Sequence, residues 1–130
     1  LTVLKKMLAL APDDDLTLRR ASLLSLQLRK YEDAERYARR ARAQNPGNTV
    51  AYLTGAEALA MKGQDRDALA LCRQVLELEP TLGYAHLLMA CCYRQLGDLA
   101  RADEAIERAR AAGKQDIERS LDELNLRRVP

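Results

Sequence analysis

The sequence predicts an all-α protein, an α-solenoid made of stacked antiparallel helix–turn–helix hairpins. Three observations favour this fold class: the composition, a 34-residue period, and apolar spacing typical of paired helices. Ala and Leu dominate the 130 residues, β-branched residues are few, and Phe and Trp are absent, which favours helix almost throughout. Apolar residues make up 48% and charged residues 31%, so the chain can bury a core and keep a polar surface.

The period is clearest in the prolines and in one column of small residues. Pro12, Pro46 and Pro80 are each 34 residues apart, a spacing typical of helical repeats. A column of alanines has the same spacing: Ala34, Ala68 and Ala102. Small side chains at one phase let two helices approach closely, and proline cannot continue a helix interior. Each period is therefore predicted to be one tight hairpin that ends at a proline.

Apolar spacing within a period predicts two helices. In the second unit, Tyr52, Ala56 and Leu59 are spaced i, i+4 and i+7 along residues 50–62, and a second amphipathic run includes Ala68.

The third unit repeats this pattern, with helices predicted over 84–96 and 99–111. Gly63 and Gly97 fall between the two helices of their units and are typical of helix C-caps. In the first unit, Arg29 occupies the position equivalent to these two glycines.

The predicted organisation is a single domain over residues 1–130. Its segments are 1–14 (second helix of an incomplete unit), 15–48, 49–82 and 83–116 (three complete units), and 117–130 (a C-terminal capping helix, N-capped by Asp116, or the start of a further unit). The chain is expected to be an excerpt of a longer array. Because an uncovered apolar face favours association, we expect self-association through residues 1–12.

Two segments carry a family resemblance. The stretches YRQLGDLARA (93–102) and GQDRDA (63–68), with the period, the alanine column and the closing prolines, resemble the tetratricopeptide repeat (TPR) family. The resemblance implies a right-handed superhelix in which the first helix of each hairpin lines a concave groove and the second lies on the convex outside. The first unit departs from the family pattern, with Ser25 in place of an aromatic residue and Arg29 in place of glycine.

By this resemblance, the first helices supply the partner-binding residues. The surface is apolar with isolated charges, which suits an extended peptide or an amphipathic helix. The candidate residues are Leu16, Arg19, Leu23, Leu53, Glu57, Tyr84, Leu87, Cys91 and Arg94. Tyr84, Arg19 and Arg94 are expected to contribute most, because Tyr and Arg are enriched among residues that dominate binding energy.

The implied function is a non-catalytic protein–protein interaction scaffold. Arg outnumbers Lys, a bias typical of GC-rich bacterial genomes, and bacterial arrays of this kind serve secretion, exopolysaccharide export or assembly machines. The alternatives are an accessory arm of a larger enzyme or transporter and a nucleic-acid-binding helical repeat. A clamp for the C-terminal carboxylate of a chaperone is not expected, because Glu57 occupies one of its sites and would repel the ligand.

Several other classes are disfavoured. The net charge of +2 is too small to indicate nucleic acid as the main partner, and the basic run Arg36–Arg42 is predicted to be a solvated helix face. His86 is the only histidine, so no catalytic constellation is expected. Cys91 and Cys92 follow it at spacings that do not share a helix face, so we expect no metal site and no cofactor. No stretch approaches the roughly 20 apolar residues of a membrane span.

The cysteine pattern bears on the compartment. Three cysteines, Cys72, Cys91 and Cys92, do not form a disulfide framework. Reduced, partly buried thiols favour the cytoplasm, with the periplasm as the alternative. A disulfide between Cys72 and Cys92 is left open.

Overall fold

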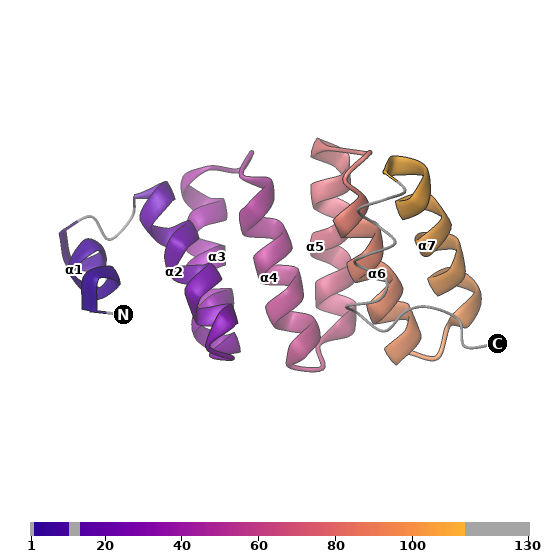
Figure 1. Cartoon of the computed structure of the whole chain (residues 1–130), viewed down its shortest axis with the longest axis horizontal. Coiled ribbons are helices and arrows are strands. Elements are labelled where there is room, and N and C mark those ends of the chain that lie inside the picture. The colour runs from indigo at the N-terminus through magenta and orange to yellow at the C-terminus, as the bar shows by residue number, and fades with distance from the viewer. Residues whose placement is uncertain (1, 11–13, 114–130) are drawn as a thin grey trace.

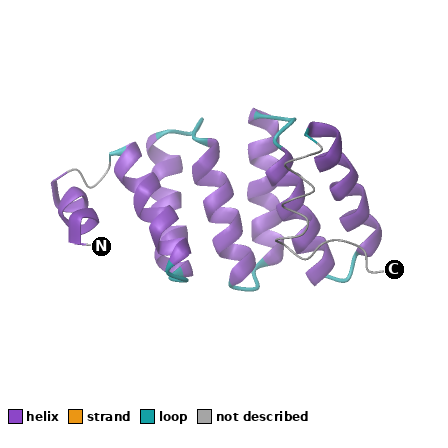
Figure 2. Ribbon diagram, viewed as in Figure 1, coloured by secondary structure: helices purple, strands orange, loops and turns teal. Residues whose placement is uncertain are grey.

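The structure, a computed structural model, describes residues 2–10 and 14–113, and within them it contains seven helices and no strand. The helices are α1 (Thr2–Leu10), α2 (Asp15–Gln27), α3 (Tyr31–Gln44), α4 (Thr49–Met61), α5 (Asp65–Leu78), α6 (Gly83–Gln95) and α7 (Leu99–Ala112). They stand in a row from α1 at one end to α7 at the other (Figure 1), and short loops join them (Figure 2). The predicted all-α stack of antiparallel hairpins is confirmed. The predicted helix at 117–130 and Asp116 lie outside the described residues.

The helices pair along the chain into hairpins. α2 packs on α3, α4 on α5 and α6 on α7, while α3–α4 and α5–α6 contacts join each hairpin to the next. The first helices also contact one another, α2 with α4 and α4 with α6, whereas α3, α5 and α7 make no mutual contact among the described helices. A stack whose first helices touch and whose second helices separate is curved toward the first helices. We call the surface of α2, α4 and α6 the inner face and that of α3, α5 and α7 the outer face.

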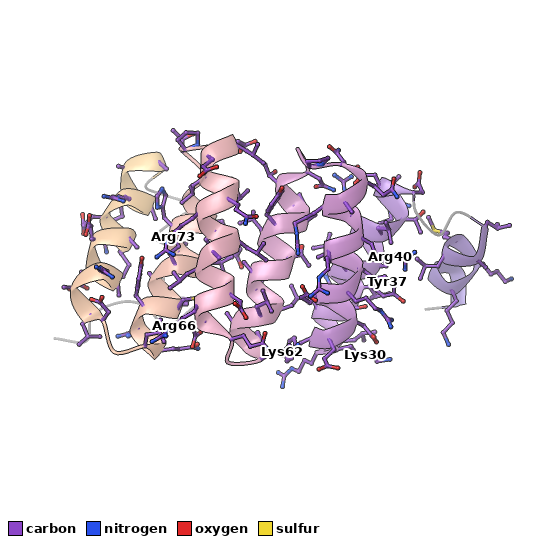
Figure 3. All side chains as sticks on the ribbon, turned by 180° about the vertical axis from the view of Figure 1, so that it is seen from behind. Lys30, Tyr37, Arg40, Lys62, Arg66 and Arg73 are labelled. Carbon is purple, nitrogen blue, oxygen red and sulfur yellow. The ribbon has the colours of Figure 1, made fainter. Side chains whose placement is uncertain are left out.

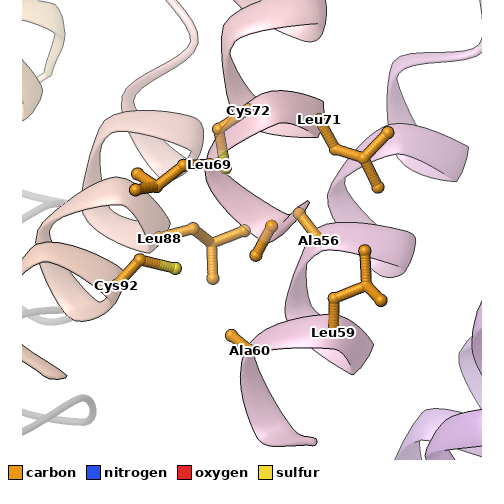
Figure 4. Close-up of a cluster of buried hydrophobic side chains, with 9 residues drawn as sticks. Ala56, Leu59, Ala60, Leu69, Leu71, Cys72, Leu88 and Cys92 are labelled. Atoms are coloured by element: carbon orange, nitrogen blue, oxygen red, sulfur yellow. The ribbon is translucent and has the colours of Figure 1, made fainter. Parts of the chain in front are cut away.

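The core runs through the hairpins and between them. The alanine column found in the sequence is buried: Ala34 and Ala68 are 0% exposed and Ala102 is 4% exposed. The largest cluster of buried residues joins α4, α5 and α6, with Leu59, Cys72 and Leu88 among its members (Figure 4). Each hairpin therefore depends on its neighbour to cover its apolar side.

The turn inside each hairpin uses one residue with positive φ. Gly63 has φ 80° and Gly97 has φ 83°, and Arg29 holds the same position in the first hairpin with φ 61°. A side chain in this left-handed conformation costs about 1–2 kcal/mol, which glycine avoids. The prediction that the two glycines end helices is consistent with these angles.

Replacing Arg29 by glycine is expected to stabilise the protein. Relief of the left-handed strain outweighs the larger entropy of glycine in the unfolded chain, so Arg29→Gly should raise the free energy of unfolding by about 0.5–1 kcal/mol. Urea denaturation followed by circular dichroism measures the change. Gly97→Ala, the reverse exchange at the equivalent turn, should lower stability, and a loss of stability in Arg29→Gly would contradict the argument.

Candidate functional site

The inner face holds most of the predicted partner-binding residues at accessible positions. Leu16 and Leu23 of α2 are each 40% exposed, and Arg94 of α6 is exposed. The remaining accessible members of the set are half-buried: Arg19, Leu53, Glu57, Tyr84 and Cys91. The surface therefore combines apolar contact area with a few polar groups.

Leu87 is the exception and is removed from the partner-binding set. Its side chain is 0% exposed and belongs to a buried cluster with Ala105, Ile106 and Ala109 of α7. A side chain held in the α6–α7 core cannot contact a ligand unless the hairpin opens. The position of Leu87 within the repeat predicted the helix face on which it lies, but not how deeply its side chain is buried.

Two polar residues meet across adjacent hairpins on the inner face. Tyr84 Oη of α6 donates a hydrogen bond to Glu57 Oε1 of α4 over 3.1 Å. Burial raises the pKa of the Glu57 carboxyl above its ordinary value of 4.5, and the Tyr84 hydrogen bond opposes this rise only in part. Desolvation thus leaves the carboxylate incompletely stabilised, so it favours a cation or a further hydrogen-bond donor from a ligand.

The raised pKa predicts how stability depends on pH. The native state of Glu57 holds its proton to higher pH than the unfolded chain, so this residue's contribution to stability is fully present below pH 4.5 and is lost as pH rises through the native pKa. Glu57→Gln can still accept the Tyr84 hydrogen bond and carries no charge. We expect this variant to melt at a higher temperature than wild type near pH 7, with the difference vanishing below pH 4.5.

The control for this measurement is Glu77→Gln, on an exposed position of α5. Thermal melts of both variants and wild type across the acid range, followed by circular dichroism, separate a local effect at Glu57 from a general effect of charge. A wild-type advantage over Glu57→Gln at pH 7 would contradict the predicted sign.

The basic run of α3 is largely engaged within the chain. Arg39 Nη2 donates to both carboxylate oxygens of Glu35, over 2.8 and 2.9 Å. Arg42 Nη1 donates to the Ala51 carbonyl oxygen of α4 over 3.3 Å, and its guanidinium lies 5.7 Å from the centre of the Tyr52 ring. Arg42 therefore ties the first hairpin to the second, and these guanidinium groups are not arranged as a free phosphate-binding surface.

The remaining reactive side chains are placed in the core or bonded to backbone. Cys72 and Cys92 are buried, Cys91 is half-buried, and all three are free thiols. Burial raises the pKa of each thiol, to about 12 for Cys72 and Cys92 and about 11 for Cys91, so the reactive thiolate is scarce at neutral pH. His86 Nε2 lies 3.4 Å from the Pro80 carbonyl oxygen. In the part of the chain that the structure describes, no group of three His, Cys, Asp or Glu side chains is placed to hold a metal ion.

The backbone of the N-terminal helix α1 lies close to α2 only among the described helices, and its Leu8 packs against the cluster of Leu18, Ala41 and Ala51. At its end Leu10 is 87% exposed, and residues 1, 11 and 12 of the predicted self-association segment lie outside the described ranges. Within those ranges, no helix combines the length and apolar character needed to cross a lipid bilayer.

Sequence comparison bears on the family. Residues 59–120 match the model of the tetratricopeptide repeat family, and this stretch covers the end of α4 and all of α5, α6 and α7. Residues 59–120 are therefore similar to tetratricopeptide repeats. The resemblance found in segments 63–68 and 93–102 is confirmed.

Solved structures show the same TPR fold. The tetratricopeptide repeat protein TTC0263 of Thermus thermophilus is 23% identical and superposes with a TM-score of 0.82 over 96% of this chain and 71% of its own. MamA AMB-1 is 26% identical, with a TM-score of 0.79 over 85% of this chain and 66% of its own. The first TPR domain of human RPAP3 is 18% identical, with a TM-score of 0.76 over 86% of this chain and 90% of its own. The chain thus spans just under two thirds of the MamA chain.

The TPR fold is generally a non-catalytic protein-interaction module. The family match and these neighbours therefore support the coarse prediction of a protein–protein interaction scaffold.

Proposed function

We propose that the inner face of this TPR stack binds an extended peptide or a helical segment of a protein partner, and that the chain acts as a scaffold in a bacterial secretion, exopolysaccharide-export or assembly machine. The observation that carries the proposal is the half-buried Glu57–Tyr84 pair, which bridges α4 and α6. A polar pair of this kind, set in an apolar surface, gives a ligand both contact area and a fixed orientation.

The chemistry of the inner face narrows the ligand. Leu16 and Leu23 lie two helical turns apart on α2 and are each 40% exposed, which suits apolar anchor residues. Glu57 favours a Lys or Arg side chain or a backbone N–H of the ligand, because its carboxylate is incompletely stabilised. The proposed ligand is therefore a segment with apolar anchors and a cation, not an acidic C-terminal tail.

A site-specific photo-crosslinker tests the proposal. We would place benzoylphenylalanine at position 23 on the inner face or at position 43, an exposed position of α3 on the outer face, and identify the captured proteins by mass spectrometry. A partner is expected from position 23 and not from position 43. It should be lost in the variant Leu53→Glu, Tyr84→Ala, Arg94→Glu, provided circular dichroism shows that this variant is folded.

Two outcomes would contradict the inner-face proposal. If the same partner is captured from position 43, or if the folded triple variant retains it, the outer face or the ends of the stack bind. If neither position captures a protein, the alternative of an accessory arm in a larger enzyme or transporter is favoured. A nucleic-acid binder would instead show affinity that falls steeply with salt.

Self-association through residues 1–12 is a separate proposal. Its support is the exposure of Leu10, which is 87% accessible at the end of α1, since exposed apolar surface favours association. Light scattering over a concentration series should show dimers that Leu10→Lys reduces. A strict monomer at high concentration would contradict it.

A further inference from the structure

The outer face carries a groove between α5 and α7. These two helices do not touch, and the floor between them is formed by Tyr93 of α6 and by Leu96, which directly follows α6. Two hollows, of about 420 and 210 Å³, share Tyr93 and Arg101 and adjoin along this line. Arg66 and Arg73 of α5 form the wall opposite Arg101 of α7. We call this surface the α5–α7 groove.

Two cations of the groove have no carboxylate partner in the described part of the chain. Arg66 is exposed and makes neither a hydrogen bond nor an ion pair there. Arg73 Nη2 donates to Tyr93 Oη over 3.2 Å, which fixes the guanidinium without neutralising it. Figure 3 shows both side chains on the back of the molecule, beside α5.

The acidic residues of the groove are already engaged. Asp98 Oδ2 lies 3.5 Å from Arg101 Nε, and Glu104 Oε1 lies 2.8 Å from Arg108 Nη2. These two carboxylates therefore neutralise the cations of α7. They leave the positive charge of Arg66 and Arg73 uncompensated.

The preceding hairpin provides an internal comparison. One 34-residue period earlier, the positions of Arg66, Leu69 and Arg73 are held by Glu32, Glu35 and Arg39. The second hairpin therefore has Arg66 where the first has Glu32, and Leu69 where the first has Glu35.

The two acidic residues of the first hairpin are each paired with a neighbouring cation. Glu32 Oε1 lies 3.6 Å from Lys62 Nζ, and Glu35 accepts from Arg39 over 2.8 Å. Arg42 then lies over Tyr52 of the floor. Between α3 and α5, Glu32 and Glu35 are thus each paired with a cation, whereas the equivalent positions in the α5–α7 groove hold Arg66 and Leu69.

We propose that the α5–α7 groove binds an acidic, extended peptide segment with two carboxylates three residues apart. Arg66 and Arg73 are two helical turns apart, a rise of roughly 10.5 Å. In a polyproline II segment, side chains three residues apart share a face at a separation of roughly 9 Å. Two such carboxylates can meet the two guanidinium groups, each by a charge-assisted hydrogen bond.

The apolar part of the groove determines which residues of the ligand fit between its two carboxylates. Leu96 is 44% exposed at its floor, and Leu69, 4% exposed, backs the wall between the arginines. An apolar ligand side chain between the two acids would cover Leu96. The groove thus selects an acidic–x–x–acidic segment with an apolar residue inside, a ligand of opposite charge preference to the one proposed for the inner face.

The test uses a defined probe, the fluorescein-labelled peptide Gly-Glu-Pro-Leu-Glu-Gly with blocked ends, titrated by fluorescence anisotropy at low salt. Wild type should bind it, and Arg66→Gln with Arg73→Gln should weaken binding roughly tenfold or more. The control is Arg20→Gln with Arg36→Gln, which removes the same charge from exposed positions of α2 and α3 and should leave the affinity within roughly twofold. A probe with Gln in place of both Glu should bind roughly tenfold more weakly or worse.

Each contrary outcome overturns the proposal. If the wild-type protein does not bind the probe at about 1 mM, the proposed site does not exist. If the control pair weakens probe binding as much as the Arg66 and Arg73 pair does, the effect is one of general charge. Loss of probe binding in Tyr84→Ala with Arg66 and Arg73 intact would move the peptide to the inner face. Tight binding of a single-stranded oligonucleotide that depends on Arg66 and Arg73, without peptide binding, would identify a nucleic-acid site. Circular dichroism confirms that every variant is folded.

Discussion

Leu87→Ala is expected to lower the free energy of unfolding by about 2–5 kcal/mol, the range for truncating a fully buried leucine. Leu87 is 0% exposed and packs in one cluster with Ala90, Ala105 and Ile106. The small alanines around it cannot move far enough to fill the space that its side chain leaves. Urea denaturation followed by circular dichroism measures the loss.

Leu53→Ala is the matched control for this prediction. Leu53 lies one 34-residue period before Leu87, on the equivalent turn of α4, but it is half-buried. It should therefore lose distinctly less stability. Equal, small losses in both variants would show that Leu87 is accessible and belongs with the inner-face residues after all.

The contrast between Leu53 and Leu87 shows what repeat phase can predict. Periodicity places both residues on the same face of the first helix, because helix geometry is local. Their different burial depends on the side chains that neighbouring helices supply, which no single helix encodes. All seven described helices, the positive-φ turns at Gly63 and Gly97 and the buried alanine column were accessible to sequence reasoning for the same local reason.

Contacts between hairpins were not accessible in this way. The hydrogen bond from Arg42 to the Ala51 carbonyl, and that from Arg73 to Tyr93, each join residues on different helices. Spacing alone predicted Arg42 as part of a basic run. A usable signal was present, however: comparing charges at equivalent positions shows Arg66 where the preceding unit has Glu32.

The two faces of the stack therefore differ in chemistry. The inner face is apolar around a carboxylate, Glu57, whose pKa is raised by burial, whereas the α5–α7 groove presents Arg66 and Arg73, which have no acidic partner among the described residues. Because the two surfaces lie on opposite sides of α6, occupation of one does not block the other. The two proposals therefore do not exclude each other, and the inner-face and groove variants test them independently.

Ala68→Leu is expected to lower the free energy of unfolding by about 1–3 kcal/mol through overpacking. Ala68 is 0% exposed in the cluster that joins α4, α5 and α6, so a larger side chain must push the helices of the hairpin apart. Since each hairpin is stabilised by its neighbours, the strain reaches both adjoining interfaces. The control is Ala70→Leu, an exposed position on the same helix, where leucine costs almost nothing in helix propensity. If both variants unfold at the same urea concentration, the close approach of α4 and α5 does not depend on the small side chain at position 68.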